Sequence, residues 1–435
     1  MVTTDYPAVI TPLVRQHAAD AAFYWQQLNS SRLSALQSAE DITVFQHYLQ
    51  ANLDGLRIAG DEGWRQALQA FKRWKTQGEA YVCTRLAYQF GDQEKLDTCW
   101  QLVTSMPETS LEGHIAALIT QPTDILLARL RTLYTAGDSL SLHVFLLASS
   151  QLTQLLAPDI LQQAFDHDDE NVRAAVCHYV VQQQQLTWLP HLQARLNDQS
   201  LMVRYSAAVA IGWLAAGQST TFAQLWTVIE AYQQAPSRKG LAGLQHTQRL
   251  ETLVRLAGQN FAASGDDINR VFAALPPYLT VLFLAHAGDA RQLPHLLALC
   301  GENAQAESSD DTVKISNNAV APLAFWAIHV LTGLNMEDSR YILLAMNHID
   351  DENAVTDRVS QLSTGLYWPN LPVITPLCQE KISTSAPLLL GQPITVAHCQ
   401  AVLATGRQVE RYIANWHLFR QRTAEQHIDL SKDIF

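Results

Sequence analysis

The amino-acid sequence predicts an all-α protein, arranged as a solenoid of antiparallel helix pairs. Residues 156–217 contain two copies of one unit, each an apolar helix, a short polar turn and an Ala-rich helix. Their Val-Arg pairs, at 172–173 and 203–204, are 31 residues apart. The tetrapeptide Leu-Pro-His-Leu at 189–192 also recurs at 293–296, 104 residues further on. Repeats of this length are typical of helical solenoids, in which each helix pair buries its apolar face only against its neighbours.

An acidic residue and a later basic residue recur in the same order in the two copies. Asp168 and Asp198 lie in the turns, and Arg173 and Arg204 lie early in the helices that follow. An Asp there can accept backbone N–H groups at the helix start, and the Arg can reach an adjacent turn and pair with its Asp. We interpret these four residues as a structural ladder between repeats, with a ligand-binding role as the alternative. The same order of Asp and Arg resembles HEAT repeats.

The helical pattern divides the chain into three predicted parts. Residues 1–60 form an N-terminal helical cap, with Val44, Tyr48 and Leu49 at helical spacing. Residues 61–335 form the HEAT-like solenoid, in which Gly78-Glu79, Gly91-Asp92 and Gly137-Asp138 break helices. Longer loops are expected at 235–243 and 301–316, and an Ala-rich helix at 318–333 ends at Gly333.

Residues 336–435 form the third part, a C-terminal helical segment. Its stretch from Tyr367 to Pro393 is rich in proline and is expected to be irregular and extended. A helix from Thr395 to Gly406 and a final helix from Arg407 to about 423 follow. Trp368, Arg407 and Arg411 are candidate partner-binding residues, because Trp and Arg are enriched in binding hot spots. Alternatively, Trp368 is buried against the C-terminal helices, and the arginines hold it or cap a carbonyl group.

The amino-acid composition indicates what type of protein this is and which kinds of partner it can bind. The chain has 435 residues, of which 48% are hydrophobic and 16% charged, which is a globular composition. Its formal charge of −12 disfavours binding to nucleic acid and suits either a basic partner or solubility alone, of which the second is the more common case. Six scattered cysteines and the lack of a signal peptide or a long apolar run predict a cytoplasmic protein that does not span a membrane.

No motif indicates catalytic residues, a cofactor or a metal. His348, Asp350, Asp351 and Glu352 lie close together in the sequence, but consecutive side chains point in different directions, and we interpret them as a solvated helix boundary. The sequence contains no HExxH, GxSxG or P-loop motif. We therefore expect a non-enzymatic protein. An enzyme on the helical scaffold, such as a lyase or an effector-modifying enzyme, is the less favoured alternative.

Several short motifs resemble a family of bacterial HEAT-repeat proteins encoded with type VI secretion and PAAR-like effector genes. The matching segments are NLDGLRIAG at 52–60, APLAFWA at 321–327, LTG at 331–333, WPN at 368–370 and LGQPIT at 390–395. The final helix departs from the family, in which it is more basic. The resemblance implies a scaffold, adaptor or chaperone for a secretion effector or its PAAR-like carrier. The alternative is an immunity protein that sequesters a cognate toxin.

Overall fold

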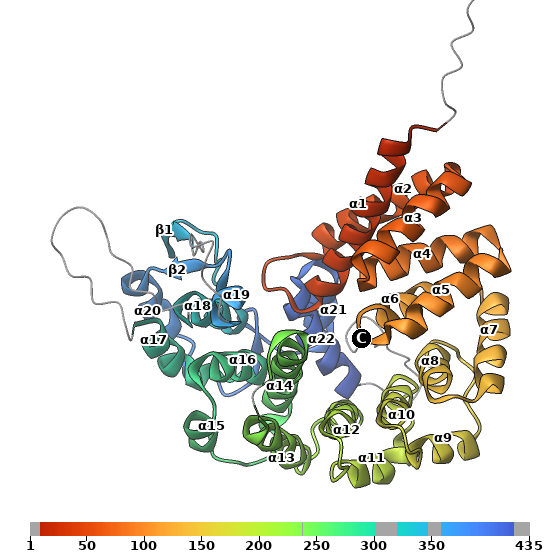
Figure 1. Ribbon diagram of the computed structural model, residues 1–435. Coiled ribbons are helices and arrows are strands. Elements are labelled where there is room, and N and C mark those ends of the chain that lie inside the picture. The colour runs from red at the N-terminus through yellow and green to blue at the C-terminus, as the bar shows by residue number, and fades with distance from the viewer. Residues whose placement is uncertain (1–8, 237, 302–319, 347–357, 422–435) are drawn as a thin grey trace, which may run out of the picture. The chain divides into compact units, whose positions relative to one another are not determined.

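The computed structural model describes residues 9–236, 238–301, 320–346 and 358–421. These residues form helices almost throughout, with two short antiparallel strand pairs (Figure 1), so the predicted all-α class is confirmed. The chain divides into two compact units, an N-terminal unit up to Gln184 and a C-terminal unit that begins at Gln185. The division therefore lies inside the segment that the sequence analysis treats as one solenoid. None of the helices described is long and apolar enough to cross a membrane.

The N-terminal unit is a succession of helices, each packed on helices near it in sequence. Its elements are α1 (Thr11–Ser30), η1 (Ser31–Leu33), α2 (Ala39–Ile58), α3 (Asp61–Trp74), α4 (Gln77–Phe90), α5 (Gln93–Ser105), α6 (Pro107–Ile119), α7 (Thr123–Ala136), α8 (Ser139–Ser149), α9 (Pro158–Phe165) and α10 (Glu170–Gln182). Contacts join α1 to α2, α4 to α6 and α8 to α10. The core at its start is apolar and includes Trp25, Leu53, Leu56 and Leu86.

Glycine followed by aspartate ends one helix and begins the next, as predicted. Gly91 and Gly137 adopt φ angles of 64° and 70°, a left-handed conformation that favours glycine. The side chain of Asp92 then accepts from the backbone N–H of Glu94 at 2.9 Å, and that of Asp138 accepts from Ser141 at 2.9 Å. These caps satisfy N–H groups that have no partner inside the helix.

The break predicted at Gly78 is wrong. The helices separate at residues 75–76, and Gly78 lies in the first turn of α4. A Cβ atom at Gly78 would lie only 2.6 Å from the carbonyl oxygen of Ala22 in α1. This glycine therefore permits close packing of two helices rather than a turn.

The C-terminal unit begins with helix pairs and ends with mixed elements. It contains η2 (Leu186–Trp188), α11 (Leu189–Arg195), α12 (Leu201–Leu214), α13 (Thr221–Gln234), α14 (Gly240–Phe261), α15 (Ile268–Ala274), α16 (Pro277–Ala287), η3 (Ala290–Gln292), α17 (Leu293–Gly301), α18 (Val320–Thr332), β1 (Ile342–Met346), α19 (Arg358–Ser363), β2 (Tyr367–Pro369), α20 (Leu371–Gln379), β3 (Leu388–Leu389), β4 (Gln392–Pro393), α21 (Val396–Thr405) and α22 (Gln408–Gln421). Both Leu-Pro-His-Leu copies start a helix that follows a short 3-10 turn, η2 before α11 and η3 before α17. The internal match therefore reflects a repeated local structure.

The proline-rich stretch is only partly extended. Strand β2 pairs with β1, with Ile342 opposite Pro369, and β3 pairs with β4. The expectation of irregular structure is wrong for residues 371–379, which form α20. Pro372 stands in the first turn of α20, where a missing N–H group leaves no helical hydrogen bond unmade.

The last helix, α22, is largely buried inside the C-terminal unit and contacts α12 (Figure 1). The indole nitrogen of Trp416 donates to the carbonyl oxygen of Gly212 at 3.2 Å. The rings of Tyr412 and Phe419 meet Trp213 edge to face, at 5.8 and 5.4 Å between ring centres. The face of α12 that carries Gly212 and Trp213 is thus covered by the chain's own final helix.

Candidate functional site

An exposed group of apolar side chains lies on the first two helices. We call it the aromatic patch. Its exposed members are Phe23, Val44 and Tyr48, and the partly buried rings of Tyr24 and Phe45 complete it. Tyr24 of α1 stacks on Tyr48 of α2 with 5.0 Å between ring centres. Phe23 meets Tyr24 edge to face at 5.3 Å, and Phe45 lies 6.2 Å from Tyr24. The four rings therefore form one continuous group across two helices.

The aromatic patch is open to solvent. Phe23 is 52% exposed, Tyr48 51% and Val44 42%. Contiguous exposed apolar groups are uncommon on soluble proteins and mark sites of interaction with other molecules. This patch is therefore the strongest candidate for a protein-binding surface in the described residues.

The local sequence explains how the patch is formed. The opposite faces of the two helices carry the buried residues, among them Ala18, Trp25 and Leu53. A capping box of Ser38 and Asp41 fixes the start of α2. Burial of one face leaves the other to solvent, since helical residues three and four apart share a face.

Sequence reasoning missed this surface. The sequence places Val44, Tyr48 and Leu49 at helical spacing without separating them, whereas Leu49 is buried and the other two are exposed. The sequence did offer one indication of this surface: the two helices contain more aromatic residues than their buried faces can hold. Periodicity alone does not identify which apolar residues meet a neighbour.

Acidic side chains flank the patch. Asp20 precedes Phe23 and Tyr24 by one helical turn, and Asp41 precedes Val44 and Phe45 in the same way. Asp20 accepts a hydrogen bond from Gln16 at 2.6 Å. The surface therefore combines apolar rings with negative charge, which suits a partner with apolar anchors and basic residues.

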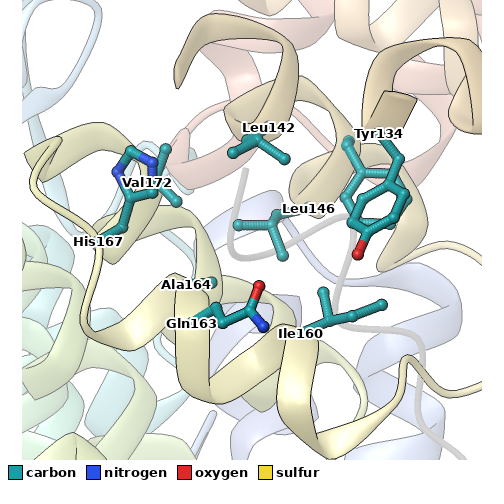
Figure 2. A pocket seen from close by; sticks show the side chains of 9 residues that line it. Tyr134, Leu142, Leu146, Ile160, Gln163, Ala164, His167 and Val172 are labelled. Carbon is teal, nitrogen blue, oxygen red and sulfur yellow. The ribbon is translucent and has the colours of Figure 1, made fainter. Parts of the chain in front are cut away.

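A small pocket of the N-terminal unit lies among α7, α8, α9 and α10, with a volume of about 70 Å³ (Figure 2). Its lining residues are Tyr134, Leu142, Phe145, Leu146, Ile160, Gln163, Ala164, His167 and Val172. Tyr134 and His167 lie on opposite sides, with Leu142 and Leu146 between them. The pocket is far smaller than the roughly 300 Å³ at which ligand sites begin. It suits one apolar side chain of a partner better than a substrate.

The repeat residues stabilise their own turns. Nη1 of Arg173 donates to the carbonyl oxygens of His167 and Asp168, both at 2.8 Å. Arg204 donates in the same way to the carbonyl oxygen of Asp198, six residues before it. The carboxylate of Asp198 accepts from the backbone N–H of Ser200 at 2.9 Å. In both copies the arginine thus donates to a carbonyl oxygen of the turn before its helix, and the ladder between repeats stays a prediction.

The predicted partner-binding residues at the C-terminal end are tied into the fold. Trp368 lies half-buried in β2. Arg407 forms an ion pair with Glu337 at 2.7 Å, and Arg411 donates from Nε to the carbonyl oxygen of Leu403 at 2.9 Å. Arg411 therefore caps the end of α21, which is the structural role that the sequence analysis offered as its alternative.

The predicted acidic group of His348, Asp350, Asp351 and Glu352 lies outside the described residues. Within the described ranges, no three His, Cys, Asp or Glu side chains lie together as metal ligands would. No family model, curated protein or solved structure matches the chain. The functional interpretation therefore depends on the surfaces described above.

Proposed function

We propose that this protein is a non-enzymatic protein-binding scaffold, adaptor or chaperone, and that its partner docks on the aromatic patch. The observation that carries the proposal is the exposure of Phe23 and Tyr48, which form one group of rings with the partly buried Tyr24 across α1 and α2. Aromatic side chains bring a large contact area with little conformational entropy to lose, and they are frequent hot spots. The half-exposed rings of Phe23 and Tyr48 would be buried in the complex.

We further propose that the helix pairs are HEAT-type repeats that stack as a solenoid. The matched contacts of Arg173 and Arg204 with their turns support this arrangement. So do the two Leu-Pro-His-Leu helices, α11 and α17, each begun by a 3-10 turn. A solenoid of this kind offers an extended surface for a protein ligand and needs no active site.

The charge pattern indicates the chemical character of the partner. The chain carries a formal charge of −12, and Asp20 and Asp41 flank the aromatic patch. A basic, apolar segment of a secretion effector or of its PAAR-like carrier is the partner that agrees with both this charge and the sequence resemblance. Electrostatic attraction of this kind raises the association rate and weakens with salt.

The test is co-purification of a secretion effector with tagged wild-type and variant chains, the effector being taken from the genes that neighbour the one for this protein. We expect the double variant Phe23→Ser and Tyr48→Ser to lose the effector and to melt like the wild type, because both side chains are exposed. Leu241→Ser in α14 is the matched control, since Leu241 is 50% exposed and lies in the other unit.

Two outcomes would redirect the proposal. Full binding by the double variant would exclude the aromatic patch as the docking surface. Loss of binding with Trp368→Ala or Arg411→Ala instead would assign docking to the C-terminal segment.

An immunity protein is the second candidate function, and the charge of −12 favours it, because toxins that act on nucleic acid carry basic clefts. Deletion of the gene distinguishes the two. Self-intoxication of the producing cell supports immunity, whereas a viable cell that fails to secrete its effector supports a chaperone.

A further inference from the structure

Two cysteines of the N-terminal unit lie in contact with each other. Cys83 of α4 and Cys99 of α5 are both 0% exposed, and Sγ of Cys99 donates to Sγ of Cys83 at 3.4 Å. The two residues are 16 positions apart in the sequence, and α4 packs directly on α5. The packing of these two helices therefore brings two thiol groups together.

The separation of the two sulfurs is short enough for a covalent bond to form with little rearrangement. A disulfide has a sulfur–sulfur length of about 2.05 Å, so each Sγ needs to move by only about 0.7 Å towards the other. A small rotation about the Cα–Cβ bond of each residue moves its sulfur over such a distance. The thiol pair is therefore close to the arrangement that a disulfide requires.

Helix α5 is the element that can move away and admit a reagent to the thiols. Only Cys99 and Val103 are buried among its 13 residues, whereas α4 buries nine of its 14 residues. Elements with few buried apolar contacts open at a lower free-energy cost than the rest of a domain. Opening of α5 exposes both thiols to small molecules in solvent, and its return brings the thiols together again.

Burial keeps the thiols unreactive while α5 is in place. Burial, followed by the hydrogen bond with Cys99, raises the pKa of Cys83 well above its ordinary value. The Cys83 thiol therefore keeps its proton at neutral pH, and a protonated thiol is a much weaker nucleophile than a thiolate. We accordingly expect any oxidation of this pair to be slow and to depend on the opening of α5.

We propose that Cys83 and Cys99 are a site of oxidative modification, at which a peroxide joins α4 to α5 by a disulfide and stabilises the N-terminal unit. With α5 open, one sulfur attacks hydrogen peroxide. An S–O bond forms, the O–O bond breaks and water leaves, which gives a sulfenic acid. With α5 back in place, the other thiol attacks the sulfenic sulfur. The S–S bond forms, the S–O bond breaks, and the hydroxyl group leaves with the thiol proton as water. Two thiols are thus oxidised, and one peroxide is reduced to two water molecules.

Peptide mapping of the full chain after treatment with hydrogen peroxide tests this proposal. Unreacted thiols are blocked with iodoacetamide in urea, and trypsin then cleaves after Arg85 and Lys95, which separates the two cysteines. We expect mass spectrometry to show peptides 76–85 and 96–129 joined as the main oxidised product, and dithiothreitol to release them.

Peroxide treatment of the urea-unfolded chain is the control for this experiment, because six cysteines without a fold allow many pairings. If the folded chain gives the same mixture of pairs as the unfolded chain, the contact between α4 and α5 does not direct the reaction and the proposal is wrong. The proposal is equally wrong if Cys83 and Cys99 remain thiols or become sulfinic acids without joining.

Thermal melts of matched variants test the stabilisation. A disulfide that closes a short loop restricts the unfolded chain, so peroxide treatment should raise the melting temperature of the wild type by about 4 °C or more. Cys99→Ala should show neither the rise nor the joined peptides. Cys177→Ala is the control and should behave as the wild type does, because the Cys177 thiol of α10 donates to the carbonyl oxygen of Arg173 at 3.3 Å. No rise in the wild type, or an equal rise in Cys99→Ala, would contradict the proposal. Should Cys99→Ala fail to fold, Cys83→Ala carries the same test.

Discussion

Nε2 of His329 lies 2.9 Å from Oε1 of Glu410, and this contact ties α18 to α22 across 81 residues of sequence. The other carboxylate oxygen of Glu410 accepts from the backbone N–H of Arg407 at 2.8 Å, at the start of α22. The Glu410 side chain is only 4% exposed. One carboxylate therefore both caps the last helix and anchors it to the interior of the C-terminal unit.

Replacement of Glu410 by Gln should destabilise the C-terminal unit by about 1–3 kcal/mol at pH 7, because a charged acceptor for two groups is lost. Burial raises the pKa of Glu410, but the hydrogen bond from His329 and the N–H of Arg407 outweigh burial and hold it below its ordinary value. The stabilisation is therefore fully present above the unfolded-state pKa of about 4.3 and is lost as the pH falls through the lower folded-state pKa. Urea unfolding at several pH values should show the difference between wild type and variant shrinking below about pH 5. Equal stabilities at pH 7 would rule this role out.

Buried histidines should make the protein sensitive to mild acid. Burial lowers the pKa of His114 to about 3 and that of His417 to about 4, so both are neutral in the folded protein. In the unfolded chain they gain protons below about pH 6.5, so stability is lost as the pH falls from about 6.5 towards 4. Each histidine changes the free energy of unfolding by up to about 1.4 kcal/mol per pH unit. Urea unfolding at pH 7 and 5.5, followed by circular dichroism, measures this slope.

The histidine prediction has a matched pair of variants. His114→Gln should remove the contribution of one histidine to the pH dependence of the unfolding free energy. His47→Gln, at an exposed position of α2, should leave that pH dependence unchanged. Stability that is constant between pH 7 and 5.5 would contradict the prediction.

Gly258→Ala should destabilise the C-terminal unit by about 1–3 kcal/mol, the usual cost of overpacking. The added Cβ would meet the backbone of Phe283 at 2.4 Å, and backbone cannot rotate out of the way. Gly301→Ala in α17 is the control, because the nearest atom to its Cβ would be a Leu371 methyl carbon at 3.6 Å. Thermal melts of both variants make the comparison, and equal melting temperatures would argue against close contact of α14 with α16.

Ala208→Asp should unfold the helices around α12, because Ala208 is fully buried and the new carboxylate would have no partner. Ala223→Asp in α13 is the matched control, since Ala223 is exposed and surface substitutions usually change stability by less than about 0.5 kcal/mol. Circular dichroism and limited proteolysis report both outcomes. A folded, protease-resistant Ala208→Asp variant would show that α12 packs less tightly than its burial indicates.

The sequence by itself determined the helical class, the positions of many turns and the local repeat. Gly91 followed by Asp92 could be assigned to a turn, because the left-handed conformation and the helix cap involve only neighbouring residues. The Leu-Pro-His-Leu helices could be located for the same reason, since proline suits the first turn of a helix wherever it occurs. Arg173 and Arg204 were recognised as equivalent from spacing alone.

Only the tertiary structure decided which helix faces contact one another. Gly78 is predicted to break a helix, whereas in the structure it permits close packing against α1. Val44 and Tyr48 share helical spacing with Leu49, but only Leu49 is buried. The pairing of Glu410 with His329 joins helices that are distant in sequence, and so does the contact of Arg255 with the Trp326 ring. Helical periodicity states which residues share a face but not what that face contacts, because burial depends on the packing of the whole unit. For that reason many of the chain's turns could be predicted, whereas its candidate binding surface could not.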